Sequence, residues 1–195
     1  MSRTNATAVL LWILLFLVPA QAAQAEPPAR RCSLPGESSL GFSATWEGTV
    51  FRGTFNGFDA VINFDPADLA ASSFDVHIDV TTARTGSRER DEGMAEPDWF
   101  DFIVYPKAHY RATDFQSLGD GEFLANGQLE LKGVVHPVPV KFRWQELPGK
   151  VALDGGASIS RLDFGIGQGD WASDEIIGLL VDVEFSLELV PCVAP

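Results

Sequence analysis

The chain has 195 residues, a length that suits one ordinary domain with a targeting segment and leaves little room for a second catalytic domain. Its 14 basic and 27 acidic residues give a formal net charge of −13, which repels phosphate backbones, so we expect no nucleic-acid partner. With 46% hydrophobic and 21% charged residues, including 14 Phe and 5 Trp, the chain is too apolar for an acidic disordered protein and should bury a sizeable core.

Residues 1–25 have the pattern of a secretory signal peptide. Arg3 supplies the positive start, 8–18 form an apolar run too short to span a membrane, and Ala23-Gln24-Ala25 fits the small-x-small cleavage pattern. We therefore predict cleavage after Ala25 and a periplasmic protein. An uncleaved anchor is the alternative. Residues 26–37 are expected to form an N-terminal linker and 38–191 the folded domain.

Two cysteines stand near the two ends of the mature chain, Cys32 and Cys192. In an oxidising compartment, a single pair at the ends is expected to form a disulfide that closes a long loop. A lipid anchor on Cys32 is the alternative, but Pro28-Ala29-Arg30-Arg31 lacks the apolar-small pattern of a lipoprotein cleavage site. We predict the disulfide.

Alternating apolar and polar residues with frequent turn signals run from residue 38 onward and predict antiparallel strands, each with one buried and one wet face. We expect a closed barrel, which removes exposed sheet edges. The eight predicted strands cover residues 38–47, 50–65 (bent around Gly57), 72–82, 107–117, 121–132, 136–147, 149–163 and 175–190.

The segment from Arg84 to Tyr105 interrupts the alternation and favours one or two short helices across a barrel mouth. It carries the main concentration of basic residues in the acidic chain: Arg84, Arg88 and Arg90. These arginines are either a solvated face paired with neighbouring carboxylates or a hook for an anionic head group.

The histidines give no metal motif. His77 falls on a polar strand face, His109 stands between Lys107 and Arg111, and His136 precedes a proline. We expect none of them to have a Cys or carboxylate partner at ligand spacing, and no two share a motif. We expect no metal site and no cofactor.

Catalytic signals are weak. No Gly-x-Ser-x-Gly nucleophile elbow occurs. Asp163, Asp170, Asp174 and Glu175 cluster in sequence near Arg161 and could serve general acid–base chemistry, although such clusters more often form salt-bridged loops.

Phenylalanines are in surplus for one small sheet layer. An eight-stranded barrel is just wide enough for side chains to fill it or for one small ligand, so a filled and a hollow barrel stay equally open at this point.

An ordered set of short motifs resembles the YceI family, which comprises bacterial periplasmic lipocalin-like proteins that bind polyisoprenoid lipids. The matching stretches run through nearly the whole mature domain. They are Gly53-Thr-Phe55, Ile62 to Pro66, Arg90-Asp91, Asp98 to Asp101, Tyr105-Pro106, Gly127 to Val138, and Arg161 to Gly167 followed by Trp171.

The resemblance implies an eight-stranded antiparallel lipocalin-like barrel, with a short helix near one mouth, that encloses a tunnel for a prenyl quinone or a polyprenyl phosphate. It also implies a non-enzymatic carrier. The expected ligand-binding residues are Phe42, Phe55, Phe64, Phe74, Trp99, Phe100, Phe115, Phe142, Arg161, Asp163 and Phe164, with Arg84, Arg88 and Arg90 as head-group candidates.

Two alternatives remain beside the carrier. One is an enzyme on the same barrel that uses Arg161 with Asp163, Asp170 and Glu175 on a hydrophobic substrate. The other is a filled barrel that acts as an interaction module for a membrane-bound cytochrome b. We expect the carrier to contact a membrane only transiently.

Overall fold

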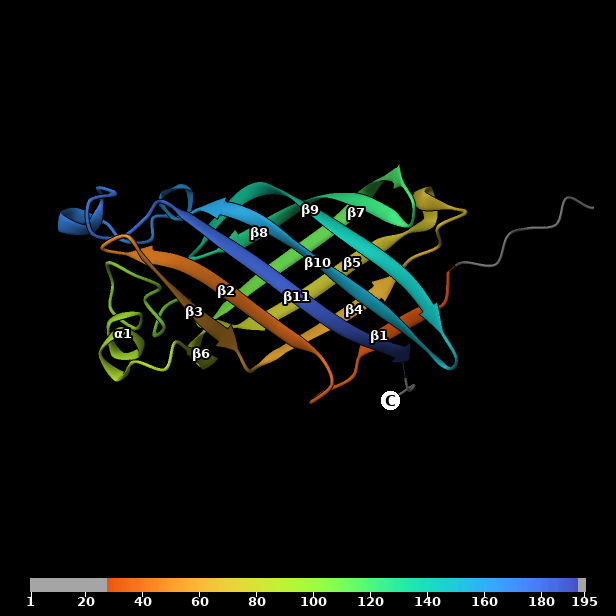
Figure 1. Cartoon of the computed structure of the whole chain (residues 1–195), viewed down its shortest axis with the longest axis horizontal. Coiled ribbons are helices and arrows are strands. Elements are labelled where there is room, and N and C mark those ends of the chain that lie inside the picture. Colours follow the sequence, from red (N-terminus) through yellow and green to blue (C-terminus); the bar gives the residue numbers. More distant parts are fainter. Residues whose placement is uncertain (1–27, 193–195) are drawn as a thin grey trace, which may run out of the picture.

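The computed structural model describes residues 28–192, and these form an all-β protein (Figure 1). Eleven strands make one sheet with antiparallel pairings. They are β1 (Arg30–Ser33), β2 (Ser39–Trp46), β3 (Thr49–Phe55), β4 (Phe58–Asn63), β5 (Ser73–Asp79), β6 (Ala83–Arg84), β7 (Lys107–Gly119), β8 (Glu122–Leu131), β9 (Val134–Leu147), β10 (Lys150–Ser160) and β11 (Leu180–Pro191).

Eight of these strands close into the predicted barrel. The ring runs β1-β4-β5-β7-β8-β9-β10-β11 and closes because β1 pairs with both β4 and β11. Near its C-terminal end β11 pairs with β1, whereas nearer its N-terminal end it pairs with β2, where Val183 lies opposite Phe42. Strands β3 and β6 continue the sheet beyond β2. The all-β barrel fold class is confirmed.

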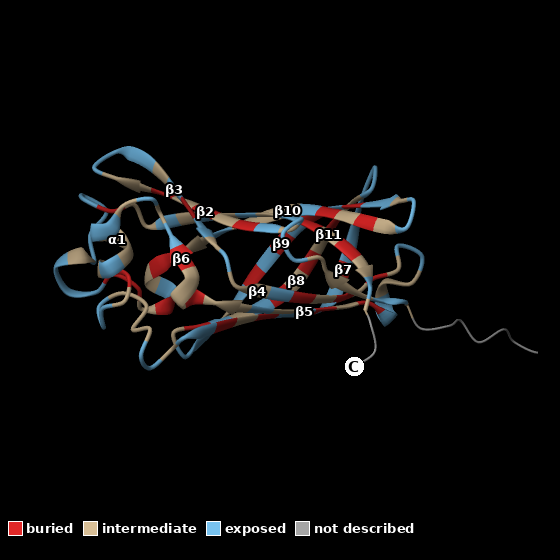
Figure 2. Cartoon of the chain, turned by 90° about the horizontal axis from the view of Figure 1, so that it is seen from below, coloured by how far each residue is buried: buried red, intermediate tan, exposed pale blue. Residues whose placement is uncertain are grey.

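Period-2 alternation positions the core. Along β9, residues 138, 140, 142 and 144 are buried while 139, 141 and 143 are exposed. The same banding of buried and exposed residues is visible around the barrel in Figure 2. Inward side chains therefore fill or line the interior, and outward polar ones face water.

Two local expectations are wrong. Residues 30–33, assigned to a linker, form β1, because their backbone groups pair with the otherwise open edges of β4 and β11. The single bent strand expected over 50–65 is two strands, β3 and β4. They separate at Asn56-Gly57 because β3 pairs with β2 and β6, whereas β4 pairs with β1 and β5.

The predicted helical segment forms α1 (Arg88–Gly93), which lies at one end of the barrel, opposite the end that holds β1 and the C-terminal end of β11 (Figure 1). Short 3-10 turns cover Leu69–Ala71, Val80–Thr82, Arg161–Phe164 and Gly169–Trp171. Within residues 28–192, no helix is long and apolar enough to cross a membrane. The predicted signal peptide, 1–25, lies outside the described residues.

The predicted disulfide is present. Cys32 of β1 bonds to Cys192, directly after β11, with their Cα atoms 5.0 Å apart. The backbone N–H of Cys192 also donates to the carbonyl of Arg30 at 3.1 Å. The bond thus joins the two ends of the described chain at the barrel end opposite α1.

Candidate ligand-binding site

The half of the barrel nearest α1 is hollow. We call this part of the barrel the cavity half. It holds a cavity of about 540 Å³, whose wall is mainly aliphatic and aromatic. Six of the expected ligand-binding residues line it: Phe42, Phe55, Phe74, Trp99, Phe100 and Arg161. The polar side chains among the lining residues belong mainly to the α1 segment, at the mouth: Thr85, Ser87, Glu89 and Arg90.

The other half is filled by an aromatic plug, defined as Phe64, Phe74, Phe115, Phe123, Phe142 and Trp144. Phe64 lies at its centre, with ring centroids 4.9 Å from Phe123 and 5.1 Å from Phe142. Phe74 is shared, because it packs against Phe115 and Phe142 at about 5 Å and also lines the cavity. The barrel is therefore hollow in the half nearest α1 and filled in the other half.

Five expected ligand-binding residues do not line the cavity. Phe64, Phe115 and Phe142 belong to the plug, where large neighbouring rings leave no space beside them. Phe164, the last residue of the 3-10 turn Arg161–Phe164, is fully buried, with its ring 5.5 Å from that of His136. The side chain of Asp163 faces solvent.

Three tryptophans gather at the mouth. Trp171 lies 6.0 Å from Trp46 and 5.9 Å from Trp99, measured between ring centroids, and all three line the cavity. Trp46 comes from β2, Trp99 from the segment after α1, and Trp171 from the loop between β10 and β11. Because all three indoles line the cavity, a ligand in it would lie close to them, which gives a fluorescence signal for binding.

Arg161 holds that loop in place. Its guanidinium is buried, with 2% of the residue exposed, and all three of its nitrogens donate to loop carbonyls. The six acceptors, at 2.6–3.1 Å, are the backbone oxygens of Ile166, Gly167, Trp171, Ser173, Ile177 and Gly178. Burial lowers the pKa of Arg161 from its usual range. These carbonyls accept from all three guanidinium nitrogens of Arg161, so the guanidinium stabilises the wall of the mouth.

The three head-group candidates have different environments. Arg90 lines the cavity, lies 4.9 Å above the Phe51 ring, and donates to the hydroxyl of Thr85 at 3.3 Å. Arg88 forms an exposed ion pair with Glu92 at 2.7 Å. Arg84 is exposed and donates to backbone carbonyls. Neither Arg84 nor Arg88 lines the cavity, so the geometry singles out Arg90.

The carboxylates near Arg161 in sequence do not form a site with it. Asp163, Asp170 and Glu175 are exposed and lie outside the cavity wall. Within residues 28–192, Arg161 has no carboxylate within ion-pair distance. The acid–base arrangement considered as an alternative, Arg161 with Asp163, Asp170 and Glu175, is not formed within residues 28–192.

Tyr110 is a polar residue of the cavity wall that sequence reasoning missed. Its hydroxyl lies 3.3 Å from the carbonyl of Ala125 and 3.2 Å from that of Val138, and burial raises its pKa well above the usual range. The hydroxyl is therefore neutral and already bonded within the wall. Alternation along 107–112 could have placed this side chain inside.

Comparison with known proteins identifies the family. Residues 34–189 match the YceI-like domain. A UPF0312 protein of Vibrio cholerae is 31% identical over 104 residues, which cover 53% of this chain and 55% of that protein, so the chain spans about half the length of this curated relative.

Two solved structures share the fold. BcnA of Burkholderia cenocepacia aligns with a TM-score of 0.77 and 27% identity, over 80% of this chain and 98% of that one. A polyisoprenoid binding domain from Saccharophagus degradans aligns with a TM-score of 0.67 and 19% identity, over 85% and 99%. With the domain match spanning most of its length, the chain belongs to the YceI family.

Proposed function

We propose that this protein binds and carries one isoprenoid lipid, a prenyl quinone or a polyprenyl phosphate, with its tail in the cavity half. The observation that carries the proposal is the apolar cavity of about 540 Å³, whose polar lining is concentrated at the mouth. Pockets that enclose small ligands typically measure about 300–1,000 Å³. An apolar tail with a polar head matches this distribution of side chains.

Burial of the tail supplies the affinity. Each methylene moved from water into an apolar wall contributes about 0.8 kcal/mol. Ten buried groups therefore contribute about 8 kcal/mol, before the cost of ordering the chain is subtracted. Because the aromatic plug closes the cavity beyond Phe74, affinity should rise with tail length only until the cavity half is full.

Three further observations support a periplasmic carrier. The Cys32–Cys192 disulfide suits an oxidising compartment. The solved relative from Saccharophagus degradans is described as polyisoprenoid binding, which supports this ligand class. The sequence-clustered carboxylates lie outside the cavity wall, which favours binding over turnover.

Native mass spectrometry of the protein purified from its own periplasm, followed by lipid extraction, tests the proposal. We expect one isoprenoid lipid per chain. The matched control is Ala157→Phe, because Ala157 lines the cavity and a phenyl ring there would occupy the ligand's space. A wild-type protein that stays empty with excess prenyl quinone and polyprenyl phosphate would contradict the proposal.

A further inference from the structure

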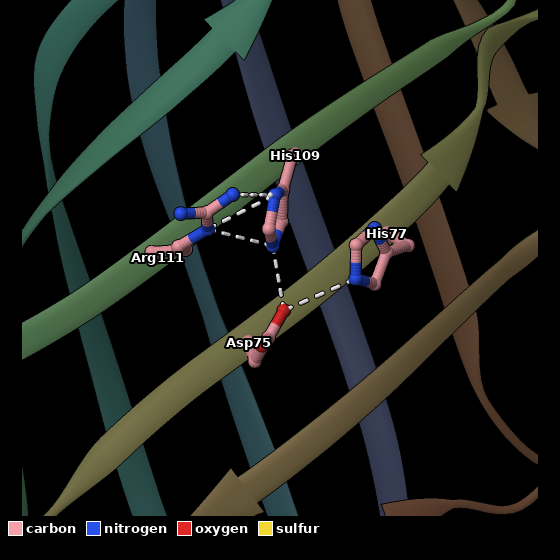
Figure 3. A network of polar contacts seen from close by, with 4 residues as sticks. All are labelled: Asp75, His77, His109 and Arg111. Carbon is pink, nitrogen blue, oxygen red and sulfur yellow. Dashed lines mark hydrogen bonds and ion pairs between the residues drawn. The ribbon is translucent and has the colours of Figure 1, made fainter.

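Three side chains with metal-ligand atoms lie together on the outer face of the barrel (Figure 3). Asp75 and His77 stand two residues apart on β5 and so project from the same face. His109 lies on β7, directly opposite His77 in the register. Period-2 spacing could have revealed the Asp75–His77 pair, whereas the third member requires the strand pairing.

The donor atoms converge. Asp75 Oδ1 lies 2.6 Å from His109 Nε2 and 3.2 Å from His77 Nε2, and the three ligand atoms all lie within 4.8 Å of one another. Ligands around a tetrahedral zinc ion stand about 3.4 Å apart, given metal–ligand distances near 2.1 Å. Small side-chain rotations on a fixed strand pair would therefore suffice.

Packing limits the cost of organising these ligands. The His77 and His109 rings stack with their centroids 4.0 Å apart and an interplanar angle of 21°. The side chain of His77 is 50% exposed, that of Asp75 53% and that of His109 15%, so an ion would approach from the side of Asp75 and His77. The cluster is preorganised and accessible.

Carboxylates flank both histidines in the sheet. Asp59 of β4 is opposite His77, and Glu130 of β8 is opposite His109, so Asp59, His77, His109 and Glu130 form one row across four strands. Paired residues project from the same face of a sheet. Asp75 within the cluster and Asp59 and Glu130 beside it make three acidic residues in all. Their charge favours the binding of a cation.

Arg111 is the competing cation. Its Nη2 lies 2.7 Å from His109 Nδ1, and its Nε donates to the same atom at 3.0 Å. In this arrangement a neutral His109 carries its proton on Nε2 and donates it to Asp75. A metal ion at Nε2 requires the proton on Nδ1 instead, so the Arg111 guanidinium must turn into solvent.

We propose that Asp75, His77 and His109 bind one divalent transition-metal ion of the Zn²⁺ type, with water as the fourth ligand. Two imidazoles and one carboxylate are a ligand set that suits this class of ion, whereas Mg²⁺ and Ca²⁺ prefer oxygen ligands. The site faces outward from the barrel wall, so it is independent of lipid in the cavity.

Titration of the tag-free protein with Zn²⁺, in competition with a chromophoric chelator, tests the proposal. We expect one equivalent to bind, and Mg²⁺ at the same concentration not to displace it. Loss of outer-shell partners alone weakens metal sites about 10–100-fold, so His109→Asn and Asp75→Asn should each weaken binding at least about tenfold. Arg111→Gln should tighten binding, because it removes the competitor.

His136→Asn is the matched control, since it removes a histidine outside the cluster and should leave the affinity unchanged. Unfolding curves of every variant check that the fold is retained. The proposal is overturned if the wild type binds no stoichiometric Zn²⁺, if His109→Asn binds as tightly as the wild type, or if Mg²⁺ competes equally.

Discussion

The aromatic plug and the cavity half share strands β5, β7, β8 and β9, yet one is filled and the other is hollow. Along β9, the change from hollow to filled occurs within four inward-facing positions. Val138 and Val140 line the cavity, whereas Phe142 and Trp144 belong to the region packed against Phe64. Since the alternation along β9 is unbroken, the size of the inward side chain distinguishes the two halves on this strand.

Stability and binding should therefore depend on different halves. In the plug, each ring packs against other rings, and removing one leaves a void that its neighbours fill only in part. In the cavity half, an inward side chain already borders empty space. A substitution there costs less folding free energy but changes the shape that a ligand meets.

The largest expected effect on stability is that of Phe142→Ala in the plug. Phe142 is 2% exposed and packs against four other aromatic rings, those of Phe64, Phe74, Phe115 and Phe123, so we expect the free energy of unfolding to fall by about 3–5 kcal/mol. Phe42→Ala in the cavity wall should cost less than about half of that. Urea unfolding of both variants measures the difference, and equal losses would break the comparison.

Loss of the disulfide should come next. Replacing both Cys32 and Cys192 by Ser should lower the free energy of unfolding by about 2–4 kcal/mol. Ligand affinity should stay near that of the wild type, because the bond lies at the end of the barrel opposite the mouth. Urea unfolding and tryptophan-fluorescence titration report the two quantities. A parallel loss of affinity would show that the two halves are coupled.

A smaller and more selective effect is expected at the mouth. Arg90→Gln should weaken polyprenyl phosphate binding about tenfold or more, because it removes a charge-assisted hydrogen bond, and should alter prenyl quinone binding far less. Arg88→Gln is the matched control, since Arg88 is ion-paired outside the cavity wall. Equal weakening of both ligands by Arg90→Gln would refute a head-group role.

Much of the fold could be predicted from the sequence because its signals are local. The alternation along 136–147 gives β9 and its inward face without any tertiary information. The four residues of β1 were missed because so short a strand has no readable period, and only the edges of β4 and β11 define it. The β3–β4 break was missed because it depends on which strands pair.

The candidate site was less predictable because depth along the barrel is not a local property. Both Phe55 and Phe64 are expected to face the tunnel, but only the strand register puts one in the cavity wall and the other in the plug. The position of Arg161 was predicted, whereas its backbone acceptors were not, since carbonyl groups leave no trace in a sequence.

One matched pair of substitutions tests the division of the barrel most directly. Ala125 is fully buried beside Phe115 in the filled half, and Ala157 lines the cavity. Ala125→Phe should overpack the core and lower the free energy of unfolding by about 1–3 kcal/mol, with lipid affinity largely retained. Ala157→Phe should abolish prenyl-lipid binding while the free energy of unfolding changes little. Undiminished lipid binding by a folded Ala157→Phe protein would contradict the account.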